Sequence, residues 1–372
     1  MRFPGFTDEW KKVTFNEVVT LQRGSSPRPI INFITHDDSG VNWVRIGDMP
    51  DTGRLVTQTE EKITVEGALK SRHVNIGDLI LSNSMSFGQP YIMGIDGYIH
   101  DGWFVLKNFE KYIERDFLCN LLIAPIIQKQ YSKLAAGGVV QNISSELVNS
   151  VKFSIPPLSE QKKIVSLLNS IDERIEIQNK IIEDLKKLKS VIRKKLFANL
   201  KNLPTEYIEI GELLNYEQPS EYIVASDEYI SDITKIPVLT ANKGFILGYT
   251  EEQFGVYSKG DCIIFDDFTM DAKYVTFPFK VKSSAIKILT AKSNVNLRFM
   301  FEYLQSMDLK SEEHKRHYIS EIATLVVAIP MIEIQNHIAC IIGSIDRKLA
   351  IEQQIAKEYE LEKLYFLSNI FI

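Results

Sequence analysis

Residues 155–197 read IPPLSEQKKIVSLLNSIDERIEIQNKIIEDLKKLKSVIRKKLF, and this stretch decides the fold. Pro156-Pro157 stops a helix from extending towards the N-terminus, and Ser159 is a suitable N-cap just after it. Apolar residues then follow a heptad repeat, which predicts a long helix that packs along a second helix. Polar residues interrupt the predicted seam at Gln178 and Lys189. The apolar seam positions are Ile164, Leu168, Ile171, Ile175, Ile182, Leu185, Ile192 and Leu196.

A second copy of this stretch occupies residues 329–371, which read IPMIEIQNHIACIIGSIDRKLAIEQQIAKEYELEKLYFLSNIF. When the copies are aligned without gaps, Ser170-Ile171-Asp172 matches Ser344-Ile345-Asp346. The polar interruptions recur as well, at Glu352 and Lys363. A chance amphipathic helix would not repeat both its apolar seam and its interruptions, so the sequence indicates an internal duplication.

Each long helix follows a segment of short β-branched runs separated by turns, which predicts a mixed, strand-rich domain. The predicted fold class is therefore α+β, with two such domains each followed by a long helix. We expect the two helices to form an antiparallel coiled coil with pseudo-twofold symmetry. The predicted domain boundaries are residues 1–154 and 205–328 for the strand-rich domains, and 155–200 and 329–372 for the helices. Residues 117–134 are expected to form one helix and residues 148–155 a strand.

The composition is that of an ordinary globular protein, with 45% hydrophobic and 24% charged residues among 372. No apolar run is long enough to span a bilayer and no basic leader opens the chain, so we expect no membrane association. Three well-separated cysteines predict buried, reduced thiols and a cytoplasmic location. The net charge of −5 is unusual for a nucleic-acid-binding protein, which is expected to be basic.

No catalytic motif is evident in the sequence. It contains no Asn-Pro-Pro-Tyr-like motif of adenine methyltransferases and no glycine-rich ATP or cofactor loop. His337 and Cys340 are spaced for one helix face but lack a second pair of ligands, and Asp266, Asp267 and Asp271 lack a fixed metal-binding spacing. We therefore expect no metal, no cofactor and no enzymatic activity of the chain itself.

With these features in place, the chain resembles the specificity subunit of type I restriction–modification systems. The resemblance is strongest where Pro156-Pro157-Leu158-Ser159-Glu160-Gln161 enters the first helix. Two departures fall in the second half: Ile334 stands where Glu160 stands in the first copy, and no Gly-Gly loop precedes the second helix. The other resembling segments are Arg2–Trp10, Arg23–Pro27, Gly138–Ser144, Leu214–Pro219 and Lys259–Ile264.

The resemblance implies a non-catalytic reader of double-stranded DNA, in which each target-recognition domain reads one half of a bipartite, asymmetric site. It also implies that the helices dock methyltransferase subunits, expected to be two, through which a restriction endonuclease/translocase subunit joins. One alternative is a coiled-coil scaffold that binds only proteins, although it would not need two dissimilar strand-rich domains. Another is a nuclease in its own right, which would require metal-dependent cleavage by this chain alone.

A helix of about 36 residues is about 54 Å long, which exceeds one DNA turn of roughly 34 Å. Antiparallel helices of this length would act as a ruler between the two readers. Such packing would bring Gln178 close to Glu352, where a buried polar pair specifies register; alternatively both face solvent. The negative net charge suggests that partner subunits supply much of the phosphate neutralisation.

Candidate DNA contacts are polar and basic residues on predicted loops, since these side chains read base edges and phosphates. Gln141 and Asn142 follow a Gly-Gly pair and either reach a groove or cap the local turn. The candidates in the first domain are Arg23, Ser25, Ser26, Arg28, Arg45, Asn83, Ser84, Gln89, Gln141 and Asn142. The candidates in the second domain are Lys243, Thr269 and Lys273.

Overall fold

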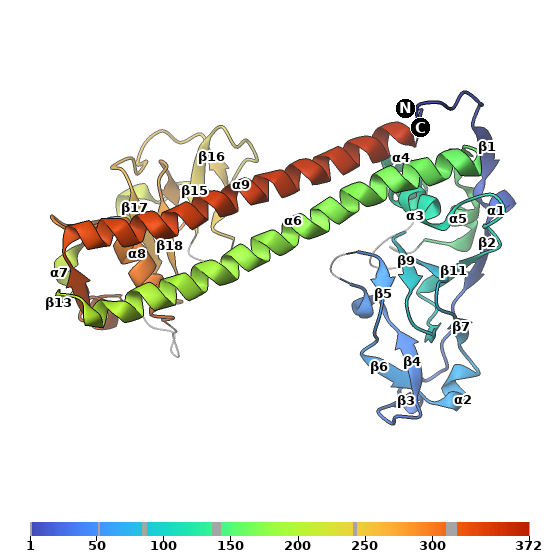
Figure 1. The fold of residues 1–372 in the computed structure, drawn as a ribbon, viewed down its shortest axis with the longest axis horizontal. Coiled ribbons are helices and arrows are strands. Elements are labelled where there is room, and N and C mark those ends of the chain that lie inside the picture. Colours follow the sequence, from blue (N-terminus) through green and yellow to red (C-terminus); the bar gives the residue numbers. More distant parts are fainter. Residues whose placement is uncertain are drawn as a thin grey trace. The chain divides into compact units, whose positions relative to one another are not determined.

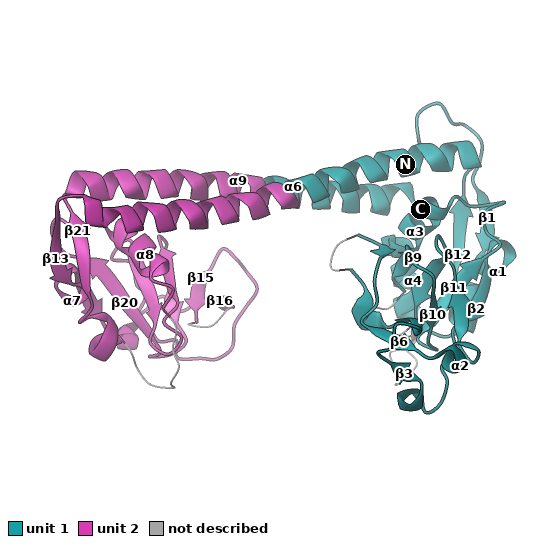
Figure 2. Ribbon diagram, turned by 60° about the horizontal axis from the view of Figure 1, so that its bottom comes forward, with its two compact units in different colours: residues 1–178, 355–372 teal, residues 179–354 magenta. Residues whose placement is uncertain are grey.

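The computed structural model describes residues 2–50, 53–83, 88–135, 143–240, 244–309 and 318–371. The chain forms two units: unit 1 combines Met1–Gln178 with Ile355–Ile372, and unit 2 is Asn179–Gln354 (Figure 2). Both long helices, α6 (Leu158–Ala198) and α9 (Ile332–Ile370), therefore contribute to both units. Each unit is a strand-rich body packed against one half of each helix.

Within the described residues, unit 1 contains a two-stranded and two five-stranded sheets. Strand β1 pairs antiparallel with β12, the strand that leads into α6. The five-stranded sheets have the orders β3-β6-β4-β10-β7 and β2-β11-β8-β9-β5. The strands are β1 (Lys11–Thr14), β2 (Thr20–Arg23), β3 (Ile34–Thr35), β4 (Val41–Val44), β5 (Leu55–Val56), β6 (Glu61–Ile63), β7 (Arg72–Val74), β8 (Leu79–Ser82), β9 (Pro90–Met93), β10 (Gly97–Ile99), β11 (Trp103–Lys107) and β12 (Lys152–Ile155).

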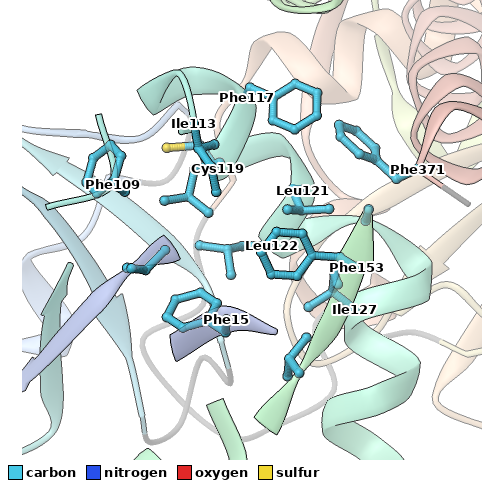
Figure 3. Close-up of a cluster of buried hydrophobic side chains, with 14 of the residues drawn as sticks. Phe15, Phe109, Ile113, Phe117, Cys119, Leu121, Leu122, Ile127, Phe153 and Phe371 are labelled. Carbon is cyan, nitrogen blue, oxygen red and sulfur yellow. The ribbon is translucent and has the colours of Figure 1, made fainter. Parts of the chain in front are cut away.

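The core of unit 1 joins the sheets to both long helices. Phe15 and Phe153 from the β1–β12 region lie in the same cluster as Phe117 and Leu121 of helix α3 (Arg115–Ile123), as Figure 3 shows. Phe371, just beyond α9, enters this cluster and meets the Phe117 ring at a centroid distance of 5.1 Å. The C-terminal end of the chain is therefore part of the core of the first strand-rich body.

Among the residues that the structure describes, unit 2 repeats this plan with fewer strands. Strand β13 pairs antiparallel with β21, the strand that leads into α9. The order β14-β20-β17-β18 of its main sheet reproduces the order β2-β11-β8-β9 in unit 1, and a three-stranded sheet has the order β16-β15-β19. The strands are β13 (Thr205–Glu209), β14 (Leu214–Glu217), β15 (Ile236–Leu239), β16 (Ile246–Thr250), β17 (Cys262–Asp266), β18 (Ala272–Val275), β19 (Lys280–Val281), β20 (Ile286–Ala291) and β21 (Val326–Pro330).

Segments of α6 and α9 run antiparallel within each unit, which confirms the expected coiled coil (Figure 1). The lysines that interrupt the heptad seams form ion pairs between the helices. Lys189 contacts Asp346 at 2.6 Å in unit 2, and its repeat equivalent Lys363 pairs with Asp172 in unit 1. The two interruptions are thus one interhelical contact made twice, as the predicted pseudo-twofold symmetry requires.

The other pair of seam interruptions is also buried. Gln178 is 7% exposed and Glu352 is 6% exposed, so the alternative that both side chains face solvent is wrong. Lys348, one turn before Glu352 on α9, pairs with the Glu352 carboxylate. Buried polar groups in a helix seam favour one register over others, although they lower stability.

Equivalent glutamines fasten each strand-rich body to its helix. In unit 1 the buried Gln161 accepts a hydrogen bond from Glu114 N at 2.8 Å and donates to the Pro156 carbonyl at 2.9 Å. In unit 2 Gln335 accepts from Asn296 N at 2.9 Å and donates to the equivalent Pro330 carbonyl. Glu114 and Asn296 are the N-caps of α3 and of α8 (Leu297–Ser306), so each glutamine satisfies a helix start that packs against it.

One departure between the two copies has a structural reason. Glu160 is fully buried and accepts two hydrogen bonds of 3.1 Å from the Arg2 guanidinium. It also accepts from Phe3 N, so this carboxylate holds the N-terminal arm against α6. Unit 2 has no separate N-terminal arm, because α6 leads directly into it. Ile334 therefore replaces the glutamate without leaving a charged group unpaired.

Two sequence expectations in the first domain are wrong. The segment 117–134 is not one helix, because Pro125 starts a new helix and Ala124 has an extended backbone. The segment 148–155 is not one strand, because Ser144 caps the short helix α5 (Ser145–Ser150) by accepting from Leu147 N. The two helices that result are α3 and α4 (Pro125–Ala135).

All three cysteines are free thiols, but their surroundings differ. Cys119 and Cys262 are buried as expected, and burial raises the pKa of each thiol to about 12. Cys340 is exposed on α9, so the expectation of three buried thiols is wrong for this residue. Among the described residues, no helix combines the length and apolar character needed to cross a membrane.

Candidate DNA interface

The loop after β2 approaches the β10–β11 turn closely because residue 24 is glycine. Gly24 N donates to the Trp103 carbonyl at 2.8 Å. A Cβ atom added at Gly24 would lie 2.0 Å from the His100 carbonyl oxygen, a distance that no side chain tolerates. The glycine of the Arg23-Gly24-Ser25-Ser26-Pro27 segment therefore allows two loops, far apart in sequence, to meet at one end of the sheet.

Four of the predicted contact residues converge on Asp101 in that turn. The Asp101 carboxylate accepts hydrogen bonds from Ser26 Oγ at 2.7 Å and from Arg28 Nη2 at 3.3 Å. Its main-chain carbonyl accepts from Arg23 Nε at 3.2 Å and from Asn83 Nδ2 at 2.9 Å. We call Arg23, Ser26, Arg28, Asn83 and Asp101 the Asp101 cluster. It joins the loops that follow β2 and β8 to the turn before β11.

The protonation states in this turn are set by its hydrogen bonds and burial. The Ser26 hydroxyl, and to a smaller extent the Arg28 charge, lower the pKa of Asp101, which keeps it a carboxylate at neutral pH. Burial lowers the pKa of His100, and its Nδ1 accepts from Gly102 N at 2.8 Å. At neutral pH the turn therefore carries one negative charge between the two arginines of the cluster.

Sequence reasoning missed a third arginine beside this cluster. Arg72 is exposed at the start of β7 and donates from Nε to the Arg23 carbonyl at 3.2 Å. It reaches this position because β7 pairs with β10, with Arg72 opposite Ile99. No signal in the sequence near residue 72 reveals this pairing. Three arginines and one carboxylate give the surface a net positive charge, which suits a polyanion.

The other described candidates of unit 1 are less exposed to solvent and have partners within the protein. Ser25 is tied by its N–H to the Ile99 carbonyl at 3.2 Å. Gln89, just before β9, accepts from Ser82 N at 3.0 Å and donates from its own N to Ser82 Oγ at 3.2 Å. The Arg45 guanidinium pairs with Glu61 at 2.7 Å and with Glu60, so its charge is already neutralised within the protein. The candidates that lie outside the described residues are Ser84, Gln141, Asn142 and Lys243.

The described candidates of unit 2 are Thr269, in the β17–β18 turn, and Lys273, near the start of β18. This turn corresponds to the β8–β9 connection of unit 1. Thr269 is exposed, and its hydroxyl accepts from Asp271 N at 3.4 Å. Lys273 pairs with the Asp271 carboxylate at 2.7 Å and is 40% exposed. These two residues are accessible, but they do not converge on a common centre as the Asp101 cluster does.

A buried lysine that sequence reasoning missed joins the corresponding loops of unit 2. Lys287 on β20 is 1% exposed and donates from Nζ to Gln218 Oε1 and to the Ser284 carbonyl, both at 3.0 Å. Its ammonium also lies 3.5 Å from the carboxylate of Asp267. Lys287 therefore links the loops after β14 and β17 to the segment before β20, the positions that Asp101 links in unit 1.

The aspartates considered as metal ligands have structural roles. Asp266 accepts from the backbone N–H groups of Phe268 and Thr269, which stabilises the turn. Asp267 accepts from Tyr318 N at 2.9 Å. Within the described ranges, no group of three or more acidic, histidine or cysteine residues is arranged to hold a metal ion.

Comparison with known proteins identifies the family of this chain. The family model described as the type I restriction modification DNA specificity domain matches residues 7–187 and again residues 202–361. The chain belongs to this family. The two matches coincide with the two halves of the duplication, and the specificity-subunit resemblance inferred from the sequence is confirmed.

Individual specificity subunits are similar over parts of the chain. The specificity subunit of the type I restriction enzyme EcoR124I/EcoR124II of Escherichia coli is 37% identical over 177 residues, which is 44% of this chain and 43% of that protein. The MjaVIII specificity subunit of Methanocaldococcus jannaschii is 29% identical over 210 residues, 53% of this chain and 48% of that subunit. The chain thus spans about half the length of these curated relatives.

Two solved structures share the fold over nearly the whole length. The crystal structure of the type I restriction–modification S subunit from M. genitalium has a TM-score of 0.59 at 16% identity, and the match covers 98% of this chain and 96% of that chain. A chain from a structural study of complex assembly and conformational transition of the type I R-M system has a TM-score of 0.60 at 16% identity, with 99% and 97% covered. At this identity the specificity-subunit structures establish the fold alone.

Proposed function

We propose that the chain is the sequence-specific DNA-recognition subunit of a type I restriction–modification complex, and that it reads a bipartite, asymmetric site. The observation that carries this proposal is the Asp101 cluster with Arg72. The arginines are exposed, neighbouring loops hold them in place, and the fold is that of a DNA specificity domain. This arrangement suits contacts with bases and phosphates better than a purely structural role. Unit 2, with its different side chains at the corresponding loops, would read an unrelated half-site.

In this proposal the two strand-rich domains, residues 1–154 and 205–328, are the readers, and the helices at 155–200 and 329–372 separate them. Helix α6 has 41 residues, which corresponds to about 61 Å of continuous helix. Each reader is fastened to its helix by a buried glutamine, so the helices can act as a rigid ruler. The spacer between half-sites would then be a geometric property of the protein.

We further propose that the helices dock two methyltransferase subunits, one for each repeat. Repeat-equivalent apolar side chains are exposed on both helices: Ile177 and Ile351 are 53% and 55% exposed, and Val191 and Tyr365 are 50% and 55% exposed. Exposed apolar groups at matching positions suit two copies of one partner. A restriction endonuclease/translocase subunit would join through these methyltransferases.

The chain itself is proposed to be non-catalytic and to act with its DNA in the cytoplasm. The net charge of −5 supports a division of labour, because the chain as a whole carries more acidic than basic residues. Partner subunits would provide much of the phosphate neutralisation that tight binding requires. Tight, specific DNA binding at physiological salt by this chain alone would contradict this division.

The test is to express the chain with the methyltransferase of the same restriction–modification system and map methylated adenines across the genome. The proposal predicts that the proteins co-purify and methylate one motif with two specific parts and a fixed non-specific spacer. Co-purification without a motif would favour the protein-only scaffold. Metal-dependent DNA cleavage by the isolated chain would favour the nuclease.

A further inference from the structure

Arg23 is held in a way that differs from an ordinary surface arginine. Its Nε donates to the Asp101 carbonyl at 3.2 Å, and its own carbonyl accepts from Arg72 Nε at 3.2 Å. Within the described residues, its terminal Nη1 and Nη2 groups have no hydrogen-bond partner. The side chain is therefore anchored through Nε, while the terminal Nη1 and Nη2 groups can donate to a ligand.

Arg28, five residues further on, is held much less firmly. Its side chain is 80% exposed, and its one ion pair among the described residues joins it to the Asp101 carboxylate at 3.3 Å. An exposed pair of this kind contributes little to stability. The same carboxylate already accepts from Ser26 at 2.7 Å, so Asp101 keeps a good partner when Arg28 moves away. Arg28 can thus exchange a carboxylate for another anion at small cost.

Resting on the proposed function, we infer that these arginines have different roles in the half-site read by unit 1. Arg23 reads a guanine, with Nη1 and Nη2 donating to O6 and N7 in the major groove. Arg28 contacts a backbone phosphate. Asp101 is a positioning residue, since its carbonyl orients Arg23 and its carboxylate fixes Ser26 beside them.

The division follows from the chemistry of the two targets. Bidentate reading of guanine needs a planar fork in a fixed orientation, which the anchored Nε of Arg23 provides. A phosphate contact needs positive charge and tolerates mobility, which the exposed Arg28 provides. Lysine carries the same charge but has no fork, so it can replace a phosphate contact but not a bidentate base contact.

The experiment compares R23K with R28K, each expressed with the methyltransferase of the same system, by genome-wide mapping of methylated adenines. For R23K we expect one G·C position in one half-site to lose discrimination by about ten-fold to a hundred-fold. The other half-site should stay unchanged, which shows that the complex is folded and assembled. For R28K we expect the wild-type motif. R28A should keep that motif as well, with weaker binding and a salt dependence reduced by about one phosphate contact.

D101N tests the part of the positioning role that the carboxylate plays. Asparagine keeps the size of the side chain and the main-chain carbonyl that holds Arg23, but it removes the charge that holds Ser26 and Arg28 in the same loop. We expect partial loss of discrimination at the same G·C position that R23K affects, with the thermal midpoint of unit 1 nearly unchanged. A wild-type motif in R23K, relaxation of the motif in R28K, or a unit-1 half-site without a G·C pair would overturn the inference while leaving the proposed function intact. Absence of any bipartite motif in the wild type would instead reject the proposed function, and the inference with it.

Discussion

Glu302 on α8 joins the second strand-rich body to the helices of unit 2, and E302Q should weaken that junction. The carboxylate is fully buried and lies 2.7 Å from Arg193 Nη2 on α6. It also lies 3.0 Å from Arg298 Nη2 and 3.4 Å from Lys189 Nζ. The substitution keeps the shape of the side chain but leaves three cations around a neutral amide.

The expected loss of stability follows from burial. Removing one partner of a buried ion pair costs about 3–5 kcal/mol. Lys189, Arg193 and Arg298 keep side-chain exposures of 15%, 16% and 26%, and Asp346 still pairs with Lys189 and Arg298. These remaining interactions reduce the expected loss to about 2–3 kcal/mol. For a unit of this size the thermal midpoint should fall by roughly 4–12 °C.

Tryptophan fluorescence provides an internal control for this experiment. The three tryptophans of the chain, Trp10, Trp43 and Trp103, all lie in unit 1, so tryptophan fluorescence reports on that unit alone. E302Q should lower the midpoint seen by circular dichroism and leave the fluorescence midpoint in place. The matched control is E183Q, which removes an exposed ion pair with Lys186 on α6 and should change neither midpoint. Equal effects of E302Q and E183Q would refute the reasoning.

Three further predictions concern unit 1. Q161L should destabilise unit 1 by about 2–3 kcal/mol, because the N–H of Glu114 at the α3 N-cap loses its acceptor. A loss of less than about 1 kcal/mol in the free energy of unfolding, followed by fluorescence, would contradict this. G24A should abolish discrimination in the unit-1 half-site, measured by methylation mapping, since its Cβ collides with the His100 carbonyl. Burial lowers the pKa of His100 below 6.5, so the unfolded chain binds that proton more readily and stability falls as the pH drops below about 6.5. H100N should remove this part of the pH dependence, measured as the fluorescence midpoint at several pH values.

The long helices and their seam could be predicted because a heptad repeat is a local pattern with a direct structural meaning. The antiparallel packing could be expected because the same helix occurs twice, after two strand-rich domains. The repeat also indicated the lysine interruptions, but not that each pairs with an aspartate of the opposite helix. That pairing depends on which residues face each other across the seam. The helix break at Pro125 was predictable in principle, since proline lacks the N–H group that a continuous helix needs.

The candidate interface could be predicted only where polar residues were close in sequence. The Arg23–Arg28 segment contains three of the five members of the Asp101 cluster, and its glycine marks a tight turn. Asp101, Arg72 and Lys287 were missed, because strand pairing between distant segments brings them to these loops. The ion pairs of Arg45 could not be predicted for a similar reason: its acidic partners Glu60 and Glu61 lie just before and at the start of β6, which pairs with β4.

In the proposed function the two helices set the distance between the readers, and lengthening both of them tests this most directly. One heptad inserted after Gln178 and another after Glu352 would preserve the seam and add about 10 Å to each helix. Methylation mapping of the lengthened protein should show the same two half-sites separated by about three more base pairs. An unchanged spacer, with both half-sites still recognised, would contradict the claim that the helices measure the DNA.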